Sequence, residues 1–395
     1  MNWQALVVVG MLASTMISRV AANDITVISF GRADQAALTK AYYRPFHEAT
    51  GVDVISLSYD GQTTELDQMS KTGKTTWDVI QVESRTLELG CRDGLFEKLD
   101  FSKIGSKSDF IPGAVSDCGV GVFAWSMALA YDAEKVKGAP KSWADFWDLK
   151  KYPGKRGLRR SAKYTLEIAL LADGVAPADV YKLLATKEGV NRAFRKLDRI
   201  KRDTIWWQAA ADPALYLADG FFVMTSAYTL WIDREQQRRN FRISWNGSLY
   251  DVDSWAIPKG TPKVSDAYQF IAFASKPENQ KVLSEQMAYG PTNTKALPLL
   301  APDLVGTLPS AAANLKSALK VDTAFWIRHG EALEKRFDAW APQICVQQTD
   351  EDEEPVDYKG HAVCQDKRGD LHSVLDNPQP SEGAPHSHHG NSHSH

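Results

Sequence analysis

Several aromatic residues of this sequence stand close to acidic residues, a pattern suited to binding an organic cation. Trp206 and Trp207 precede Asp212, and residues 250–255 read Tyr-Asp-Val-Asp-Ser-Trp. The face of an aromatic ring attracts an ammonium group by about 0.5–2 kcal/mol, and a carboxylate supplies the opposite charge. A single aromatic residue is more typical of a hydrophobic core. The 250–255 cluster favours a binding role because residues 256–260 continue as a strand that ends in a turn.

Motifs for catalysis are missing from the sequence. It contains no Gly-x-Ser-x-Gly, no Gly-x-x-x-x-Gly-Lys and no His-Glu-x-x-His. His47 and His329 are the only histidines before residue 346, so an acid-base pair built on histidine is not expected. Catalysis by carboxylates stays open as an alternative. We therefore expect a binding protein without a cofactor or a catalytic residue.

The N-terminal residues 1–22 have the features of a secretory signal peptide. The apolar run Ala5–Ala13 is followed by Val20-Ala21-Ala22, a small-residue cleavage site. About nine apolar residues fall far short of the ~20 that span a bilayer. No cysteine follows the run to accept a lipid, and its only basic residue, Arg19, comes after it. The sequence predicts a periplasmic protein whose mature chain begins near Asn23.

The four cysteines, Cys91, Cys118, Cys345 and Cys364, all follow the predicted cleavage site. An even number of cysteines in an exported chain favours disulfides, and four cysteines allow three pairings. We favour Cys91 with Cys118 and Cys345 with Cys364, because each pair closes a short loop worth about 3 kcal/mol. No Cys-x-x-Cys spacing occurs, so no metal site is predicted.

The C-terminal residues 346–395 differ from the rest of the chain in composition. They hold ten acidic residues against three basic ones, a net charge of −7, which leaves +4 for residues 1–345 of the total of −3. An acidic run at 350–354 precedes Pro, Gly, Ser and His with little apolar periodicity, so this tail is predicted to be mostly disordered. Its last ten residues include five histidines, which could chelate a divalent metal weakly, although a solvated low-complexity end is the simpler interpretation.

Helices and strands are predicted to alternate from the mature N-terminus. The predicted strands are Ile25–Phe30, Val52–Leu57 and Trp77–Val82, and the predicted helices are Ala36–Thr50, Thr64–Thr72, Asn191–Ile200 and Ser265–Ser275. Gly51 and Gly73 are expected to end the first two helices, Pro45 to kink the first, and Ser265 to cap the last. The β-α-β-α-β order predicts a parallel sheet whose ligands bind beyond the carboxyl ends of its strands.

Seven short segments occur in an order shared with one family of exported binding proteins. They are Ile25–Gly31, Pro45–Gly51, Trp77–Ile80, Ser142–Trp147, Asp253–Pro258, Phe270–Ala274 and Tyr289–Asn293. In this order, from about residue 25 to 342, the chain resembles the periplasmic spermidine/putrescine-binding proteins, the solute-binding components of polyamine-type ABC importers.

The resemblance implies the α/β fold of a two-lobed, type II periplasmic binding protein, with parallel-sheet lobes joined by crossing strands around a ligand cleft. About 370 mature residues with 44% hydrophobic content also exceed one core. The implied first lobe holds residues 23–126 and 256–297, and the second holds 127–255 and 298–345. A monomer is expected to close on a small solute and to deliver it to the ABC permease subunits.

The resemblance also assigns residues to the cleft. Asp253 matches the amine-binding carboxylate of the family, and Tyr228 falls where an aromatic residue lines the pocket. Phe30 takes the position of the aromatic residue after the first strand, and Glu83 that of a small polar contact. Trp255, the last residue of the 250–255 cluster, is counted as a further ligand contact.

Other positions depart from the polyamine-binding pattern. Asp251 replaces an expected aromatic residue, and Ser161 and Tyr164 stand where polyamine binders have acids. Arg85 lies where an aromatic residue is expected, and Arg32 lies near the loop after the first strand. Two unpaired arginines would repel a polyamine. A ligand with one amine and one carboxylate would suit the acids at one end and an arginine at the other.

Alternatives remain at the level of the sequence. Arg32 could pair with Asp34 and Arg85 with Glu83, which would leave neither arginine for a ligand. The basic stretches 150–163, 192–202 and 234–242 are interpreted as solvated helix faces, and nucleic acid is not an expected partner. An amine-binding transport receptor is the leading hypothesis, before a binding protein of the same fold for an anion or a metal, and before a periplasmic enzyme.

Overall fold

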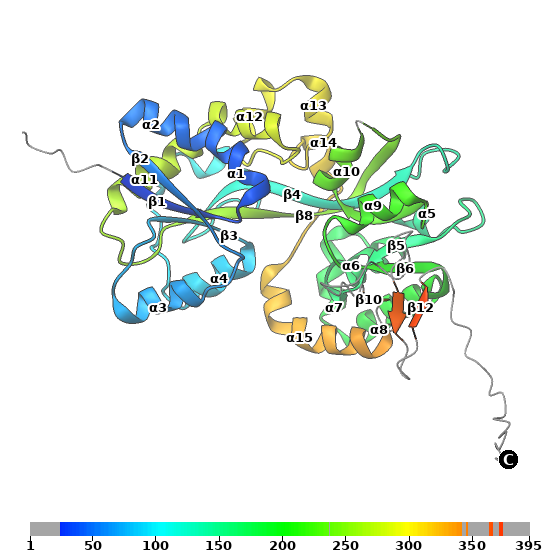
Figure 1. Ribbon diagram of the computed structural model, residues 1–395. Helices are drawn as coiled ribbons and strands as arrows, with labels where there is room; N and C mark the ends of the chain where they lie inside the picture. Colours follow the sequence, from blue (N-terminus) through cyan, green and yellow to red (C-terminus); the bar gives the residue numbers. More distant parts are fainter. Residues whose placement is uncertain (1–23, 237, 342–344, 347–362, 366–370, 374–395) are drawn as a thin grey trace, which may run out of the picture.

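Nine strands form one mixed sheet that runs through both halves of the protein (Figure 1). The computed structural model describes residues 24–236, 238–341, 345–346, 363–365 and 371–373. The strands of the sheet are β1 (Asp24–Ser29), β2 (Asp53–Ser58), β3 (Val79–Val82), β4 (Val120–Asp132), β5 (Arg156–Arg159), β6 (Thr204–Trp207), β7 (Met224–Tyr228), β8 (Phe241–Ala256) and β9 (Leu319–Lys320). Their order is β2-β1-β3-β8-β4-β7-β5-β6, and β9 pairs with β8. The predicted signal peptide, 1–22, lies outside the described residues.

Two long strands, β4 and β8, cross from one half to the other. In the first half β1 pairs in parallel with β2 and β3, and in the second half β5 pairs in parallel with β6 and β7. The crossing strands are antiparallel to each other, and they join β3 and β7 as antiparallel neighbours. The predicted two-lobed α/β fold with crossing strands is therefore confirmed.

Helices cover both faces of the sheet in each lobe (Figure 1). They are α1 (Arg32–Leu38), α2 (Arg44–Thr50), α3 (Thr64–Thr72), α4 (Ser84–Arg92), α5 (Trp143–Trp147), α6 (Ala162–Ala172), α7 (Val180–Leu184), α8 (Lys187–Asp198), α9 (Asp212–Asp219), α10 (Thr229–Gln236), α11 (Val264–Ala274), α12 (Pro277–Gln286), α13 (Pro302–Gly306), α14 (Ala312–Leu315) and α15 (Thr323–Trp340). In the first lobe α1, α2 and α12 lie on one side and α3 and α4 on the other. In the second lobe α6, α8 and α15 lie opposite α9 and α10.

Each lobe has its own hydrophobic core, and the two cores meet along the crossing strands. Phe123 of β4 packs in a first-lobe cluster with Phe46, whereas Met127 packs in a second-lobe cluster with Phe337. The pairing register of β4 on β8 shifts twice around this point, between residues 121 and 123 and again between 127 and 129. Such irregularities bend a strand and increase its twist. The exact division of the chain between the lobes stays a prediction.

The predicted N-terminal elements match the structure closely, because each has a strong local pattern. The strands agree to within two residues, and Gly51 and Gly73 end α2 and α3 in the left-handed conformation. The first helix begins earlier than expected, at Arg32, and contains a π-helical stretch at Thr39–Tyr43. Pro45, the second residue of α2, comes two positions after this stretch and has no amide hydrogen for a helical hydrogen bond, which explains the irregularity at the predicted kink.

The predicted serine cap of the helix at 265–275 is wrong. Helix α11 begins at Val264, and its N-cap residue is Lys263, which makes no side-chain capping hydrogen bond. Helix α8 also begins earlier than predicted, because Thr186 caps it by accepting a hydrogen bond from the Gly189 amide. Both errors concern helix ends, and Ser265 lies inside the first turn of α11, where a polar residue can look like a cap.

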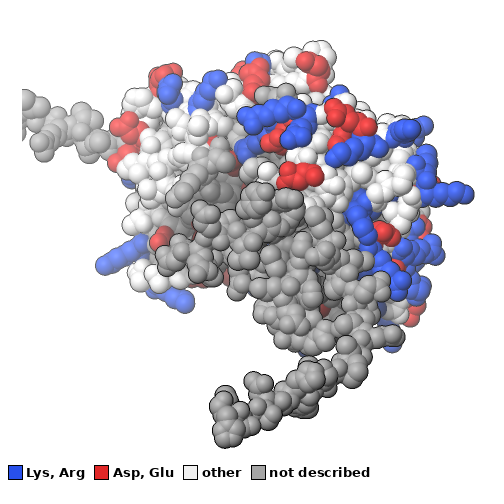
Figure 2. Space-filling model, turned by 45° about the vertical axis from the view of Figure 1, so that its right-hand side comes forward, with Lys and Arg blue, Asp and Glu red and all other residues white. Residues whose placement is uncertain are grey.

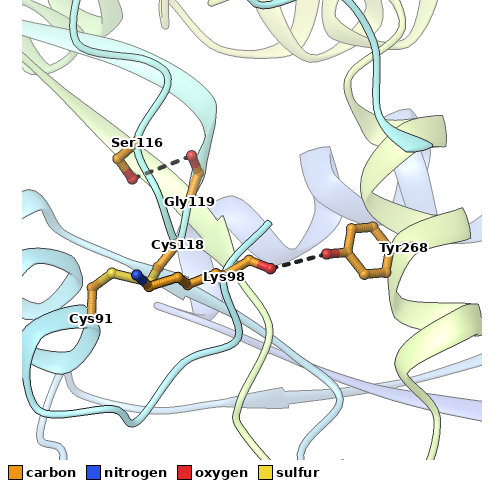
Figure 3. Close-up of a disulfide and its surroundings, with 6 residues drawn as sticks. All are labelled: Cys91, Lys98, Ser116, Cys118, Gly119 and Tyr268. Atoms are coloured by element: carbon orange, nitrogen blue, oxygen red, sulfur yellow. Dashed lines mark hydrogen bonds between the residues drawn. A yellow bond between two sulfur atoms is a disulfide. The ribbon is translucent and has the colours of Figure 1, made fainter. Parts of the chain in front are cut away.

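The predicted disulfide between Cys91 and Cys118 is present. Figure 3 shows it joining α4 to the segment before β4, where the Ser116 hydroxyl donates to the Gly119 carbonyl. The two Cα atoms are 5.8 Å apart, an ordinary separation for a disulfide. The other proposed pair lies in the short strands β10 (Cys345–Val346) and β11 (Val363–Gln365), where Cys345 and Cys364 are direct backbone partners. Their side chains lie outside the described residues, so this second disulfide stays a prediction.

Part of the tail predicted to be disordered has described structure. Strands β10, β11 and β12 (Leu371–Ser373) form a three-stranded antiparallel sheet. The remaining residues of 347–395, including the histidine-rich end, lie outside the described residues.

The surface of the second lobe is rich in basic residues. Figure 2 shows lysine and arginine gathered toward the right-hand side, with acidic residues interspersed among them. Mixed charges of this kind are typical of solvated helix faces. No helix within the described ranges is long and apolar enough to cross a membrane.

Candidate ligand-binding site

A cavity of about 300 Å³ lies between the two lobes, beside the crossing strands. Phe30 and Glu83 face it from the first lobe, and Arg159 and Tyr228 face it from the second. Each of these four residues ends a strand of a parallel pair or directly follows one, namely β1, β3, β5 and β7. Ligands of parallel sheets bind at this end of the strands. The cavity therefore lies where the topology predicts a binding site.

Asp253 of β8 provides a buried acidic group in the lining of the cavity. Its exposed fraction is 6%. The side-chain amide of Gln81 donates to one carboxyl oxygen over 3.0 Å, and the Trp125 indole donates to the other over 3.1 Å. Burial raises the pKa of Asp253 well above its ordinary value, and the nearby Glu83 raises it further. Among the described residues no cationic side chain pairs with this carboxyl group, so an ammonium ion would supply a charge partner.

Arg159 provides a cation in the same cavity. Its Nη1 atom donates to the Tyr228 hydroxyl over 2.7 Å, and its guanidinium carbon lies 5.3 Å from the Tyr164 ring centroid and 5.8 Å from that of Tyr228. Burial raises the pKa of both tyrosines, so both hydroxyls stay protonated near neutral pH. A guanidinium group that rests on two rings and gives one donor to Tyr228 can offer its other donors to a carboxylate, which it binds as a planar fork.

Aromatic rings form the walls between these two charges. The Trp125 ring meets the rings of Tyr228 and Tyr164 edge to face, at centroid distances of 5.5 and 6.1 Å. On the first-lobe side Phe30 is stacked on Tyr59 at 5.0 Å. Such walls suit a short methylene chain, and their faces attract an ammonium group.

Five of the residues predicted from the sequence come together on this cavity, namely Phe30, Glu83, Tyr164, Tyr228 and Asp253. Trp255 does not line it. Its exposed fraction is 1%, and it packs in the first-lobe core against Tyr42 and Phe270. Asp253 and Trp255 share one face of β8, but two residues along a strand displace a side chain by about 6.6 Å. The displacement is enough to move Trp255 from the cavity into the core.

Asp251 also lies away from the cavity lining. Its carboxylate forms an ion pair with Lys320 of β9 over 2.6 Å and accepts a hydrogen bond from the Ser84 hydroxyl over 2.6 Å. The Val252 amide donates to it as well. All three contacts engage the same carboxylate oxygen, Oδ1, and the ion pair joins the strand β9 to the crossing strand β8.

The other predicted residues have different surroundings. The Ser161 hydroxyl donates to Glu334 over 2.7 Å. Arg85 lines a separate space of about 330 Å³ beside Lys163 and α15. Within the described ranges no ion pair joins Arg85 to Glu83. The side chain of Arg32 lies outside the described residues, and its predicted role and its pairing with Asp34 stay predictions.

Sequence reasoning missed Arg159 and Trp125. Arg159 is the last residue of β5, so recognising residues 156–159 as a parallel strand would have directed attention to it. Trp125 had no such signal, because it stands in the long apolar strand β4, where an aromatic residue is typical of a core. Within the described ranges no group of three or more metal-ligating side chains is present.

Comparison with known proteins agrees with this geometry. A family model described as "Bacterial extracellular solute-binding protein" matches residues 41–312. The gamma-aminobutyric acid-binding protein of Pseudomonas aeruginosa is 50% identical over 331 residues, which cover 84% of this chain and 94% of that protein. Several polyamine-binding periplasmic proteins are more distant relatives, with identities of 21–23%.

Solved structures give the same result. An ABC transporter substrate-binding protein from Bradyrhizobium japonicum has a TM-score of 0.72 and 34% identity, over 81% of this chain and 99% of that one. A structure described as a GABA receptor has a TM-score of 0.71 and 31% identity, over 82% of this chain and all of that one. The resemblance noted in the sequence is confirmed, and the polyamine-binding proteins are distant relatives of this chain within it.

Proposed function

This chain belongs to the bacterial extracellular solute-binding protein family, and we propose that its solute is a short ω-amino acid of the γ-aminobutyrate type. The chain is the substrate-binding protein of an ABC importer, with an amine-bearing solute. The proposal adds the carboxylate at the other end of the solute and the residues that bind each end.

One observation supports the proposal most strongly: the cavity is lined by two acidic groups, on the crossing strand β8 and in the first lobe, and by a basic group from the second lobe. Asp253, with Glu83 nearby, would bind the ammonium group, and Arg159 would bind the carboxylate. The rings of Trp125, Tyr164 and Tyr228 would enclose the methylene chain between them. The γ-aminobutyrate-binding relative, identical in half of the aligned residues, is consistent with this arrangement.

Other solute classes fit these charges less well. A diamine would bring its second ammonium group toward the guanidinium of Arg159, and a dicarboxylate would bring a second carboxylate toward Asp253 and Glu83. Placing like charges together in a desolvated cleft is unfavourable. We therefore expect both classes to bind more weakly than a zwitterion of similar length.

A thermal-shift and calorimetric series tests the proposal. γ-Aminobutyrate and 5-aminovalerate should raise the melting temperature, because a ligand at a hundred times its dissociation constant stabilises the folded state by about 2.7 kcal/mol. Putrescine and succinate, which have similar chain lengths, serve as matched controls. A larger shift with putrescine or succinate than with γ-aminobutyrate would contradict the proposed solute class.

We also propose that the protein is a periplasmic monomer that leaves its solute unchanged. Its relatives are periplasmic or extracellular solute-binding proteins of ABC transporters, a class that is not enzymatic. Residues 1–22 would direct export, and the complex would dock on the permease subunits. Recovery of intact γ-aminobutyrate after prolonged incubation, and a monomeric mass in solution, are the expected results.

A further inference from the structure

The turn between β5 and α6 holds Tyr164 in an unusual backbone conformation. Tyr164 has a φ angle of 74°, and it is the only residue other than glycine with a positive φ in the described part of the chain. Lys163 before it is extended, so the regular helix begins only after Tyr164. A left-handed conformation is costly for a bulky residue, and such strain persists only where surrounding contacts impose it. Here it directs the Tyr164 ring into the cavity beside Arg159.

Glu334 of α15 supplies the contacts that hold this turn. One of its carboxylate oxygens accepts hydrogen bonds from the Ser161 hydroxyl, over 2.7 Å, and from the Lys163 amide, over 3.0 Å. The other oxygen accepts from the Ala162 amide over 2.8 Å. Three consecutive residues are therefore fixed by one side chain that is about 170 residues away in the sequence.

Two more contacts hold α15 against the same segment. Asp338 forms an ion pair with Arg160 over 2.8 Å, and the Trp326 indole donates to Glu167 over 2.7 Å. These contacts lie on either side of Glu334 along α15, so the helix cannot easily shift relative to the turn. The turn is fixed from outside the cavity, and Glu334 itself does not line the cavity.

From these contacts we infer that Glu334 is a positioning residue for the carboxylate end of the solute, an inference that rests on the proposed function. Without its carboxylate, two amides of the turn lose their acceptor, and Tyr164 can relax toward the ordinary right-handed conformation. The ring then leaves the face of the Arg159 guanidinium, whose orientation is less restricted when its contacts with Tyr228 remain without those of Tyr164. Arg159 loses its fixed orientation, whereas Asp253 on β8 is unaffected.

The test compares two solutes that differ only at the carboxylate end. Calorimetry would measure γ-aminobutyrate and 4-amino-1-butanol, which keeps the ammonium group and replaces the carboxylate by a hydroxymethyl group. Glu334→Ala should lower the affinity for γ-aminobutyrate about tenfold, while the affinity for 4-amino-1-butanol should change by less than about twofold. Glu331→Ala is the matched control, because Glu331 is an exposed glutamate one turn earlier on α15.

A purely structural role of Glu334 predicts a different result. If the variant is merely less stable, the affinities for both solutes fall by the same factor, and that outcome overturns the inference. Glu334→Gln, which keeps one acceptor oxygen, should recover part of the affinity for γ-aminobutyrate. In a Tyr164→Gly background the ring and the backbone strain are both absent. Adding Glu334→Ala to it should lower the affinity for γ-aminobutyrate by less than about twofold, because both residues act through the conformation of the same turn.

A measurement without any solute separates this inference from the proposed function. If the wild-type protein does not prefer γ-aminobutyrate to 4-amino-1-butanol, the proposed function fails. Amide hydrogen exchange of residues 161–165 should still be faster in Glu334→Ala than in Glu331→Ala, if Glu334 holds the turn. Equal exchange in the two variants would overturn the positioning role by itself.

Discussion

Asp251 and Asp253 are two residues apart on β8 and meet opposite kinds of partner. Asp251 is paired with the Lys320 ammonium, whereas Asp253 is held by neutral donors from Gln81 and Trp125. A paired carboxylate stabilises the folded chain, and a carboxyl group without a cationic partner is ready for a charged solute. The difference lies entirely in what surrounds each residue.

This difference leads to a prediction for two matched variants. Asp253→Asn should weaken binding of γ-aminobutyrate about a hundredfold, because it removes the charge partner of the ammonium group. Asp251→Asn should lower the free energy of unfolding, because it leaves the Lys320 ammonium without its partner, but should change affinity by less than about threefold. Calorimetry and urea denaturation of both variants give the comparison. Equal losses of affinity would show that Asp251 also serves the site.

Residue types and positions in the sequence were sufficient for part of this site. The resemblance placed Asp253, Tyr228, Phe30, Glu83 and Tyr164 on the cleft, and all five line the cavity. The sequence did not indicate Arg159 as the cation of the cavity, because the position of an arginine relative to a cleft depends on tertiary contacts. Local patterns carry no such information, and a sequence can only suggest which arginines are available.

At the scale of elements, the contact between α6 and α15 contains a buried carboxyl group that titrates. Glu167 of α6 is fully buried, and one of its oxygens accepts hydrogen bonds from Trp326 and Tyr181, while the other has no partner. Burial raises the pKa of Glu167 from 4.5 to about 7, and Lys163 and the two hydrogen bonds reduce this effect. The carboxyl group is thus protonated in the folded protein at mildly acidic pH.

The sign of the resulting pH dependence follows from linkage. Between about pH 4.5 and pH 7 the unfolded chain loses the proton of Glu167 while the folded protein keeps it, so this group lowers the free energy of unfolding as pH rises. Glu167→Gln has an uncharged side chain at every pH, like the protonated carboxyl group of Glu167. It should be more stable than the wild type at pH 8, by on the order of 3 kcal/mol, and nearly equal near pH 4.5.

Denaturation of the wild type and Glu167→Gln across this range checks the prediction, with the exposed Glu331→Gln as a control. An unchanged difference in stability between pH 4.5 and pH 8 would contradict it.

Elements were predictable where their signals are local. Strands β1, β2 and β3 and helix α3 follow from apolar periodicity and from glycine at helix ends. The strained turn before α6 did not, because a contact with Glu334, far along the sequence, imposes it. The π-helical stretch before α2 could be anticipated only as a kink, since proline indicates a disturbance without its form.

At the scale of the whole molecule, the solute would connect the two lobes. Arg159 belongs to the second lobe, while Glu83 belongs to the first and Asp253 to a crossing strand. A solute that contacts all three is bound best when the lobes are closed, so it should shift the population toward the closed state.

Small-angle scattering provides the corresponding prediction. The radius of gyration of the wild type should fall when γ-aminobutyrate is added, because the lobes approach each other. Arg159→Gln should show no such fall, even at a concentration that saturates its weakened site. Arg85→Gln is the matched control, since Arg85 is exposed and lies outside the cavity. An equal fall in Arg159→Gln would mean that closure does not need the carboxylate contact.

The two register shifts of β4 on β8 also have a mechanical consequence. They flank residues 123–127, and this stretch contains Trp125, whose indole holds Asp253. A solute that contacts Trp125 would therefore bind at the irregular point of the crossing strands, about which the two lobes could rotate. A small rotation of the lobes about Trp125 would move their outer surfaces by a larger distance. A molecule of a few atoms could therefore change the outer shape of the whole receptor.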